Sequence, residues 1–297
     1  MASCQINMNL ARVLKKVRQD GLCGAFKAVG RSIHGRLFTT GYDTEYVRPI
    51  LEKIWKLKSS ITLVEIGANV GATESDPFYK FITEHFPTKQ DSRPLKCRAV
   101  LVEPVLDLYK QLVTNYAKYQ GITCINAAIA ESAGVKRFYR FRSDIDLAAF
   151  GLPSFAYQLG SFDRNNVVSA CPVFPDEVTR TAFIKANVLE SDIPCATLQG
   201  ILDAEGIAHV DLLVIDAEGY DYQILKTINF SRSAPDYINY ERTHLRKDQA
   251  ACRRLLLKSG YALFDHNDDT LCIRGKKLTY IENVREQIYI RWLESIY

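Results

Sequence analysis

The sequence lacks long apolar runs and the marks of an exported protein. No stretch approaches the roughly 18 consecutive apolar residues that a membrane-spanning helix needs. The first residues, MASCQIN, lack the basic start, apolar stretch and small-residue cleavage site of a signal peptide. We therefore expect a chain without a transmembrane segment that works in the cytoplasm.

The sequence also lacks the cysteine spacing of a disulfide framework or a zinc site. None of its eight cysteines stands in a C-x-x-C pair, and histidine is scarce, with five residues. A chain of this length with this spacing does not need disulfides to fold. We expect the thiols to be free and mostly buried, and we expect no resident metal ion.

Neither sign of charge dominates. Lysine and arginine number 38 against 34 aspartates and glutamates, which gives a net charge of +4. That balance is too mild to indicate a nucleic-acid or membrane partner, and no basic stripe with interleaved aromatics is concentrated near the predicted ligand site. With 47% hydrophobic residues, the 297-residue chain suits one large α/β domain with an N-terminal extension.

Residues 1–60 are predicted to form a helical extension. Apolar residues recur at helical spacing over 8–35 and again over 44–58. The first of these helices has a basic face. We expect this face to be exposed to solvent, and a role in membrane binding or partner docking is the less favoured alternative.

From residue 61 to residue 275, strands alternate with helices, which is typical of a mostly parallel sheet. The predicted helices cover 76–84, 106–119, 196–206, 219–228 and 246–259. The predicted strands cover 61–66, 98–103, 121–125, 211–216, 236–241, 261–264 and 270–274. Only a tight turn separates the last two strands, so the final pair is predicted to be antiparallel.

Residues 143–195 do not follow this alternation. They are predicted to be a loop-like insertion on the acceptor side of a domain that spans 61–297. Long connections in compact domains are often lids or binding loops, and the aromatic residues here argue against disorder. Gln158, Ser161 and Phe162 are the candidate acceptor contacts within it.

The strongest local motif is VEIGANVG at residues 64–71, after a predicted strand and before a predicted helix. Its glycines allow a sharp turn and close approach to a ligand at a helix start. The spacing is G-x-x-x-G, with Asn69 where a dinucleotide loop would carry a glycine, which argues against a pyrophosphate. Glu65 indicates a ligand with an amino group, such as the methionyl end of S-adenosylmethionine. An ordinary strand-to-helix turn remains the alternative.

Two further strand ends carry candidate ligand contacts. Glu103 and Pro104 follow the second strand, where a carboxylate can accept both hydroxyls of a ribose. Ala127 and Ala128 follow the third strand, and their small side chains leave room for an adenine ring.

The fourth strand ends in DLLVIDAEGY, residues 211–220. Asp216 and Glu218 would face the same crevice, where either carboxylate can contact the cofactor, position an acceptor hydroxyl or take its proton. For Glu218, favourable placement at a helix start is an equal alternative.

Glu241 and His244 follow the fifth strand, and histidine titrates near neutral pH. For His244 alone, a surface or strand-end position is slightly favoured. We predict the general base to be Asp216, Glu241 or His244. A magnesium-assisted alternative through Asp216, Glu218 and Glu241 stays open.

Together, VEIGANVG, the VEP at 102–104, the NAAI at 126–129 and DLLVIDAEGY resemble the FkbM family of methyltransferases over about residues 61–275. The resemblance implies a seven-stranded, Rossmann-like class I methyltransferase sheet with an antiparallel last strand. It implies S-adenosylmethionine as cofactor, with the glycine loop at its methionyl end and Glu103 on its ribose. Family members act chiefly on oxygen and a few act on nitrogen.

We therefore expect an O-methyltransferase that acts on a hydroxyl of a sugar, a glycan or another small polyhydroxylated metabolite, with a homodimer left open. The alternatives are an N-methyltransferase of a peptide or small molecule, a non-catalytic binding protein and a nicotinamide oxidoreductase. The expected acceptor contacts are Glu218, Gln158, Ser161 and Phe162. The expected cofactor contacts are Glu65, Gly67, Ala68, Asn69, Gly71, Glu103, Pro104, Ala127, Ala128 and Asp216.

Overall fold

The computed structural model describes residues 44–275, apart from 74, 75, 77, 147–156, 170, 172, 173 and 175. These residues belong to one compact unit, Tyr42–Tyr297. The helix predicted over 8–35 lies outside the described residues. Within the described part, no helix combines the length and the apolarity that crossing a bilayer requires.

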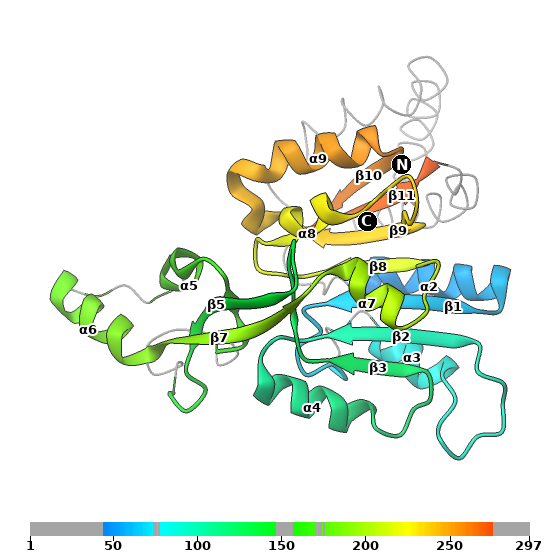
Figure 1. The fold of residues 1–297 in the computed structure, drawn as a ribbon, viewed down its shortest axis with the longest axis horizontal. Coiled ribbons are helices and arrows are strands. Elements are labelled where there is room, and N and C mark those ends of the chain that lie inside the picture. The colour runs from blue at the N-terminus through cyan, green and yellow to red at the C-terminus, as the bar shows by residue number, and fades with distance from the viewer. Residues whose placement is uncertain are drawn as a thin grey trace, which may run out of the picture. The chain divides into compact units, whose positions relative to one another are not determined.

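The main sheet has seven strands in the order β3-β2-β1-β8-β9-β11-β10 (Figure 1). All neighbours are parallel except β11, which runs antiparallel to both β9 and β10. This confirms the predicted seven-stranded sheet with its antiparallel last strand. The strands are β1 (Ile61–Ile66), β2 (Cys97–Val102), β3 (Ile122–Ile125), β8 (Leu212–Ile215), β9 (Tyr237–Glu241), β10 (Tyr261–His266) and β11 (Asp269–Arg274).

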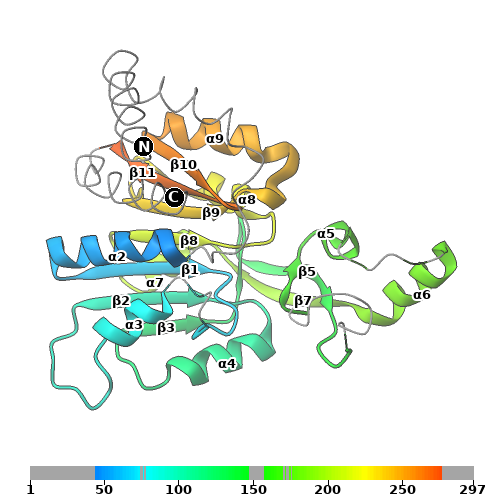
Figure 2. The ribbon, with the colours of Figure 1, turned by 180° about the vertical axis from the view of Figure 1, so that it is seen from behind.

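Helices cover both faces of this sheet, which is why a central strand such as β8 is a continuous apolar run. In β1, Leu63 packs on one side and Val64 on the other. One face carries α2 (Thr44–Lys58), α3 (Tyr79–His85) and α4 (Leu106–Tyr116). The opposite face carries α7 (Leu198–Ala204), α8 (Asp221–Thr227) and α9 (Gln249–Lys258). Figure 2 shows α2 and α3 in front of the sheet, with α7 behind it.

The helix predicted over 76–84 begins later than expected, at Tyr79. The carboxylate of Asp76 accepts hydrogen bonds from the backbone N–H groups of Phe78 and Tyr79, at 2.7 and 3.0 Å. Asp76 thus satisfies donors at the start of the helix from outside it. It is buried, and its side chain is engaged beneath the glycine loop.

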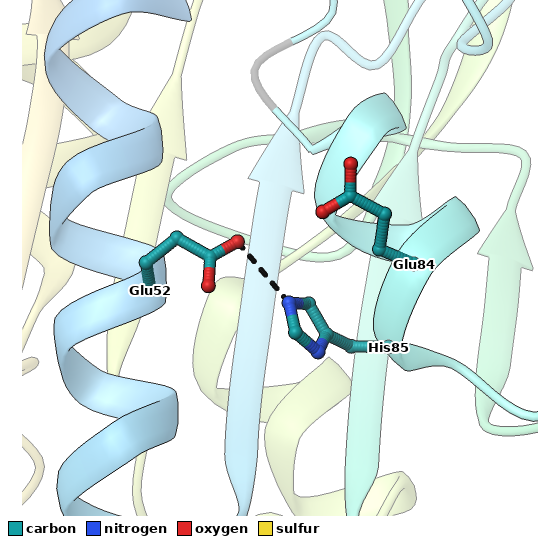
Figure 3. Close-up of side chains that lie close together, drawn as sticks. All are labelled: Glu52, Glu84 and His85. Atoms are coloured by element: carbon teal, nitrogen blue, oxygen red, sulfur yellow. Dashed lines mark hydrogen bonds and ion pairs between the residues drawn. The ribbon is translucent and has the colours of Figure 1, made fainter.

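The contact between α2 and α3 is partly polar. The imidazole Nε2 of His85 lies 3.1 Å from a carboxylate oxygen of Glu52 (Figure 3). Arg48 donates to both carboxylate oxygens of Glu84, at 2.6 and 2.5 Å. We call Glu52, Glu84 and His85 the helix-pair cluster.

A second sheet, in the order β4-β7-β5-β6, stands beside the carboxyl ends of the main strands (Figure 1). Its strands are β4 (Ala128–Ile129), β5 (Gly134–Phe141), β6 (Gly160–Ser161) and β7 (Val188–Ala196). The helices α5 (Arg164–Ser169) and α6 (Glu177–Asn187) lie between β6 and β7 in the sequence.

The loop-like interpretation of 143–195 was therefore wrong for most of the described residues in that range. Long antiparallel pairing of β5 with β7 orders the segment. The outer face of this pair is polar, and Arg137 of β5 forms ion pairs with Glu190 and Asp192 of β7.

Candidate functional site

A cavity of about 490 Å³ lies between the two sheets, at the carboxyl ends of β1, β2 and β8. This volume is in the range of small-molecule sites. Of the residues predicted from the sequence, Glu65, Ala68, Gly71, Glu241 and His244 are not part of its lining. The predicted residues that do line it are Gly67, Asn69, Glu103, Pro104, Ala127, Ala128, Gln158, Ser161, Phe162, Asp216 and Glu218.

The loops after β1 and β8 touch at the floor of the cavity. Gly67 has a φ of 86°, and a β-carbon there would overlap the backbone carbonyl oxygen of Asp216. The N–H of Asp216 donates to the carbonyl of Ile66 at 2.9 Å. Glycine is required here both for its backbone conformation and for the close approach.

Asn69 joins three parts of the site. It adopts a left-handed φ of 51°, which asparagine tolerates better than most residues. Its backbone N–H donates to Glu103, and its side-chain amide donates to Gln158, both at 2.9 Å. Asparagine in place of the dinucleotide-loop glycine thus links the β1 loop to β2 and to the second sheet.

Glu103 is buried at the end of β2. Its Oε1 accepts from the N–H of Val105 at 2.8 Å, and its Oε2 accepts from the N–H of Asn69 at 2.9 Å. Burial outweighs these bonds and raises the pKa of Glu103 to about 7. Each oxygen keeps a lone pair that can accept from a ligand hydroxyl.

Beneath the glycine loop lies a group of carboxyls that the sequence only partly revealed. Glu65 is buried, and its Oε2 has no hydrogen-bond partner. Burial, followed by the charges of Asp76 and Asp216, raises the pKa of Glu65 well above its usual value. Asp76 accepts from the hydroxyl of Tyr116 at 2.5 Å. Sequence reasoning assigned Asp76 only to a helix start and assigned no role to Tyr116.

Asp216 follows β8, and its side chain is exposed because it opens on the cavity. Desolvation, followed by the charges of Glu218 and Glu241, raises its pKa well above the usual value. A carboxylate with a raised pKa is a stronger proton acceptor than an ordinary one.

Glu218, Glu241 and His244 form a second cluster beside Asp216, which we call the site cluster. The Nδ1 of His244 lies 2.8 Å from Glu241 and 3.3 Å from Glu218. Hydrogen bonds that the imidazole donates to Glu218 and Glu241 raise the pKa of His244 to about 10. In this arrangement the imidazole carries a proton at neutral pH, and its role as a base stays a prediction.

Gly219 brings these three side chains together. Its φ is 91°, and a β-carbon on it would lie 2.9 Å from the carbonyl oxygen of His244. Glu218, just before it, adopts a left-handed φ of 49°. The acidic-glycine motif after β8 therefore packs directly against the segment after β9.

The wall of the cavity opposite the glycine loop is aromatic. The ring of Phe162 meets that of Phe138 at 5.6 Å and that of Tyr220 at 4.7 Å, both edge to face. The hydroxyl of Tyr220 donates to Glu131 at 2.5 Å, and Lys136 lies over the rings of Phe162 and Tyr220. Phe138 was missed because no strand was predicted over β5.

Two predicted acceptor residues are held by bonds within the protein. The Oε1 of Gln158 accepts from Asn69, and its Nε2 donates to the hydroxyl of Tyr157 at 3.1 Å. Ser161 accepts from Asn166 at 3.1 Å. Both residues line the cavity, and their hydrogen bonds also hold the cavity wall together.

Residues 65–278 match the family described as the methyltransferase FkbM domain. No protein of curated function matches the sequence.

Three solved structures are similar at low identity. Precorrin-6y C5,15-methyltransferase from Geobacter metallireducens is 12% identical, over 80% of this chain and 92% of its own, with a TM-score of 0.36. Ribosomal protein L11 methylase from Lactobacillus delbrueckii is 8% identical, over 77% and 76%, with a TM-score of 0.34. Aeropyrum pernix fibrillarin with bound S-adenosyl-L-methionine is 10% identical, over 72% and 65%, with a TM-score of 0.32. At these scores the likenesses carry no argument about the acceptor.

Proposed function

The chain belongs to the methyltransferase FkbM domain family, and we propose that it transfers a methyl group to a hydroxyl of a sugar, a glycan or another small polyhydroxylated acceptor. Family membership establishes that the chain is a methyltransferase dependent on S-adenosylmethionine. The acceptor and the residues that serve it are the proposal.

The residues around the cavity fit this cofactor. It carries an ammonium and a sulfonium charge. Glu65 is buried next to the lining residue Ile66, and its unpartnered Oε2 suits the ammonium. Glu103 has lone pairs available for the two ribose hydroxyls. Ala127 and Ala128 leave space on the lining for the adenine.

The cofactor supplies a methyl group already activated on sulfur. The chain then has to align the acceptor oxygen and take its proton. We propose that the carboxylate of Asp216 takes this proton from the acceptor hydroxyl. One observation carries this assignment: Asp216 opens on the cavity while its backbone touches Gly67 of the loop expected at the methionyl end. Glu241 and His244 lie farther back and pair with each other.

The aromatic wall supports a ring-shaped, hydroxylated acceptor. Phe162 and Tyr220 present flat apolar faces, which suit the C–H face of a sugar ring. Gln158 and Ser161 add polar atoms on the same side.

The acidic surroundings favour oxygen over nitrogen as the methylated atom. Asp216 and Glu218 would hold an amine as an ammonium ion, and protonation removes the lone pair that attacks the methyl group. A hydroxyl keeps its lone pairs and needs only a base. N-methylation is thus the second choice.

The cysteines support a reducing compartment. The six described ones, from Cys97 to Cys272, are all free. Free thiols of this kind are usual in the cytoplasm, where we place the activity. A homodimer stays a prediction.

The test is methyl transfer from isotopically labelled S-adenosylmethionine to matched panels of hydroxylated sugars, sugar nucleotides and amines. We expect O-methyl ethers by mass spectrometry. Asp216→Asn should lower the rate by about 10²–10⁴ while cofactor affinity is largely kept. Label found only on nitrogen would contradict the proposal.

A further inference from the structure

Among the described residues, three clusters have the same donor set in different surroundings. The site cluster (Glu218, Glu241, His244) and the helix-pair cluster each offer two carboxylates and one imidazole. In both, the three ligand atoms lie within 4.8 Å of one another. Two carboxylates and one imidazole can bind a divalent cation, so the surroundings decide which cluster does.

The helix-pair cluster already has its counter-charge. Arg48 lies 2.5 Å from Glu84 and 3.9 Å from Glu52 (the carboxylates drawn in Figure 3). A third group, His209 with Asp211 and Asp236, is likewise supplied with the ammonium of Lys58, which pairs with Asp211. A cation entering either group would have to displace a fixed positive side chain.

The site cluster has no lysine or arginine partner of this kind among the described residues. Among the residues that the structure describes, no lysine or arginine forms an ion pair with Glu218 or Glu241, and only His244 pairs with them.

A buried carboxylate next to the site cluster is a second observation that favours a cation there. Asp221 is fully buried against Glu241, whose N–H donates to its Oδ1 at 3.2 Å. The Oδ2 of Asp221 has no hydrogen-bond partner. A buried, unpartnered carboxylate oxygen is costly, and a positive charge held by the adjacent Glu241 would lower that cost.

We propose that Glu218, Glu241 and His244 bind a divalent cation at the edge of the cavity. The ion takes the place of the proton that now joins Nδ1 of His244 to the two carboxylates. Mixed oxygen and nitrogen donors suit Mn²⁺ or Zn²⁺ better than Ca²⁺. This departs from the sequence expectation of no metal and replaces Asp216 by His244 in the magnesium alternative.

An ion at this position could take part in methyl transfer. Glu218 lines the cavity, so an ion held by Glu218 would lie within reach of the acceptor. There the ion would hold an acceptor oxygen beside Asp216 and favour loss of its proton. This use rests on the proposed function, whereas the binding site does not.

The experiment titrates the full chain, freed of metal by a chelator, with Mn²⁺. The electron paramagnetic resonance signal of free Mn²⁺ reports binding, and no cofactor or acceptor is added. We expect one ion per chain. Glu241→Gln should weaken binding by at least about tenfold, and His244→Gln should do the same. The matched control, Glu84→Gln in the helix-pair cluster, should leave the affinity unchanged.

Absence of stoichiometric binding, or an equal loss in Glu84→Gln, would overturn the site. Cofactor affinity and melting temperature of each variant show that it is folded. Glu218→Gln replaces Glu241→Gln if that variant does not fold. Mn²⁺ binding without methyl transfer would contradict the proposed function alone, and methyl transfer without Mn²⁺ binding would contradict the metal site alone.

Discussion

Gly67, at the end of β1, packs so closely on Asp216, after β8, that a β-carbon on Gly67 would overlap the carbonyl oxygen of Asp216. The contact joins the loop expected to hold the methionyl end of the cofactor to the residue expected to take the acceptor proton. Both line the same cavity.

Gly67→Ala should therefore impair the site by pushing the two loops apart. We expect cofactor affinity, measured by isothermal titration calorimetry, to fall by at least about tenfold, because a misplacement of about 1 Å costs that much or more. Gly260→Ala is the matched control. Gly260 has the same φ of 86°, but a β-carbon added to it would meet no atom within 4 Å. It should lose about 1–2 kcal/mol of stability and keep its cofactor affinity. Equal effects of the two substitutions would show that the contact with Asp216 does not matter.

The pKa of Glu103, raised by burial to about 7, makes cofactor affinity depend on pH. Ribose hydroxyls donate to the ionised carboxylate, so binding is strong above the pKa and weakens as the pH falls through it. We expect affinity to drop by about tenfold per pH unit below 7 and to level off above 8. Glu103→Gln should bind weakly at all pH values with a flatter profile. A wild-type profile flat from pH 6 to pH 8 would remove Glu103 from the ribose site.

His209 should make the stability of the fold depend on pH at the opposite end of the sheet. Hydrogen bonds to Asp211 and Asp236 raise its pKa from 6.5 to about 9. Because the folded pKa is above the unfolded one, its contribution is complete below pH 6.5 and is lost as the pH rises through 9. The free energy of unfolding of the wild type should therefore exceed that of His209→Gln at pH 6, and the difference should shrink by pH 10. Urea denaturation at both pH values checks this, and a constant difference would contradict it.

Phe162 should affect the acceptor more than the cofactor, because it lies on the aromatic wall against Tyr220. Aromatic pairs of this kind contribute about 0.5–1.5 kcal/mol beyond the area they bury. We expect Phe162→Ala to raise the KM for the acceptor severalfold and to leave the cofactor affinity within about twofold. A loss of cofactor affinity with an unchanged acceptor KM would reverse the assignment of this wall.

The main sheet was predictable because both of its faces are buried. Every residue of β8 and four of the six residues of β1 are apolar, so these runs stand out from their surroundings. The glycine loop and the acidic motif after β8 were recognisable for a related reason: the backbone approach at Gly67 and Gly219 excludes any side chain.

The second sheet was not predictable in the same way. In β5, basic and aromatic residues are mixed without a strict alternation, and Arg137 is paired with acidic residues of β7 that are distant in the sequence. Asp76 and Tyr116 meet beneath the glycine loop only through tertiary packing. Likewise, the pairing of His244 with two glutamates could be read only from the fold.

The most direct test of the account is a structure of the chain determined with S-adenosylhomocysteine. We expect the ligand in the cavity, with its ribose hydroxyls on Glu103, its amino group toward Glu65 and its sulfur facing Asp216. A ligand bound elsewhere, or one turned so that its sulfur faces away from Asp216, would contradict the site described for this chain.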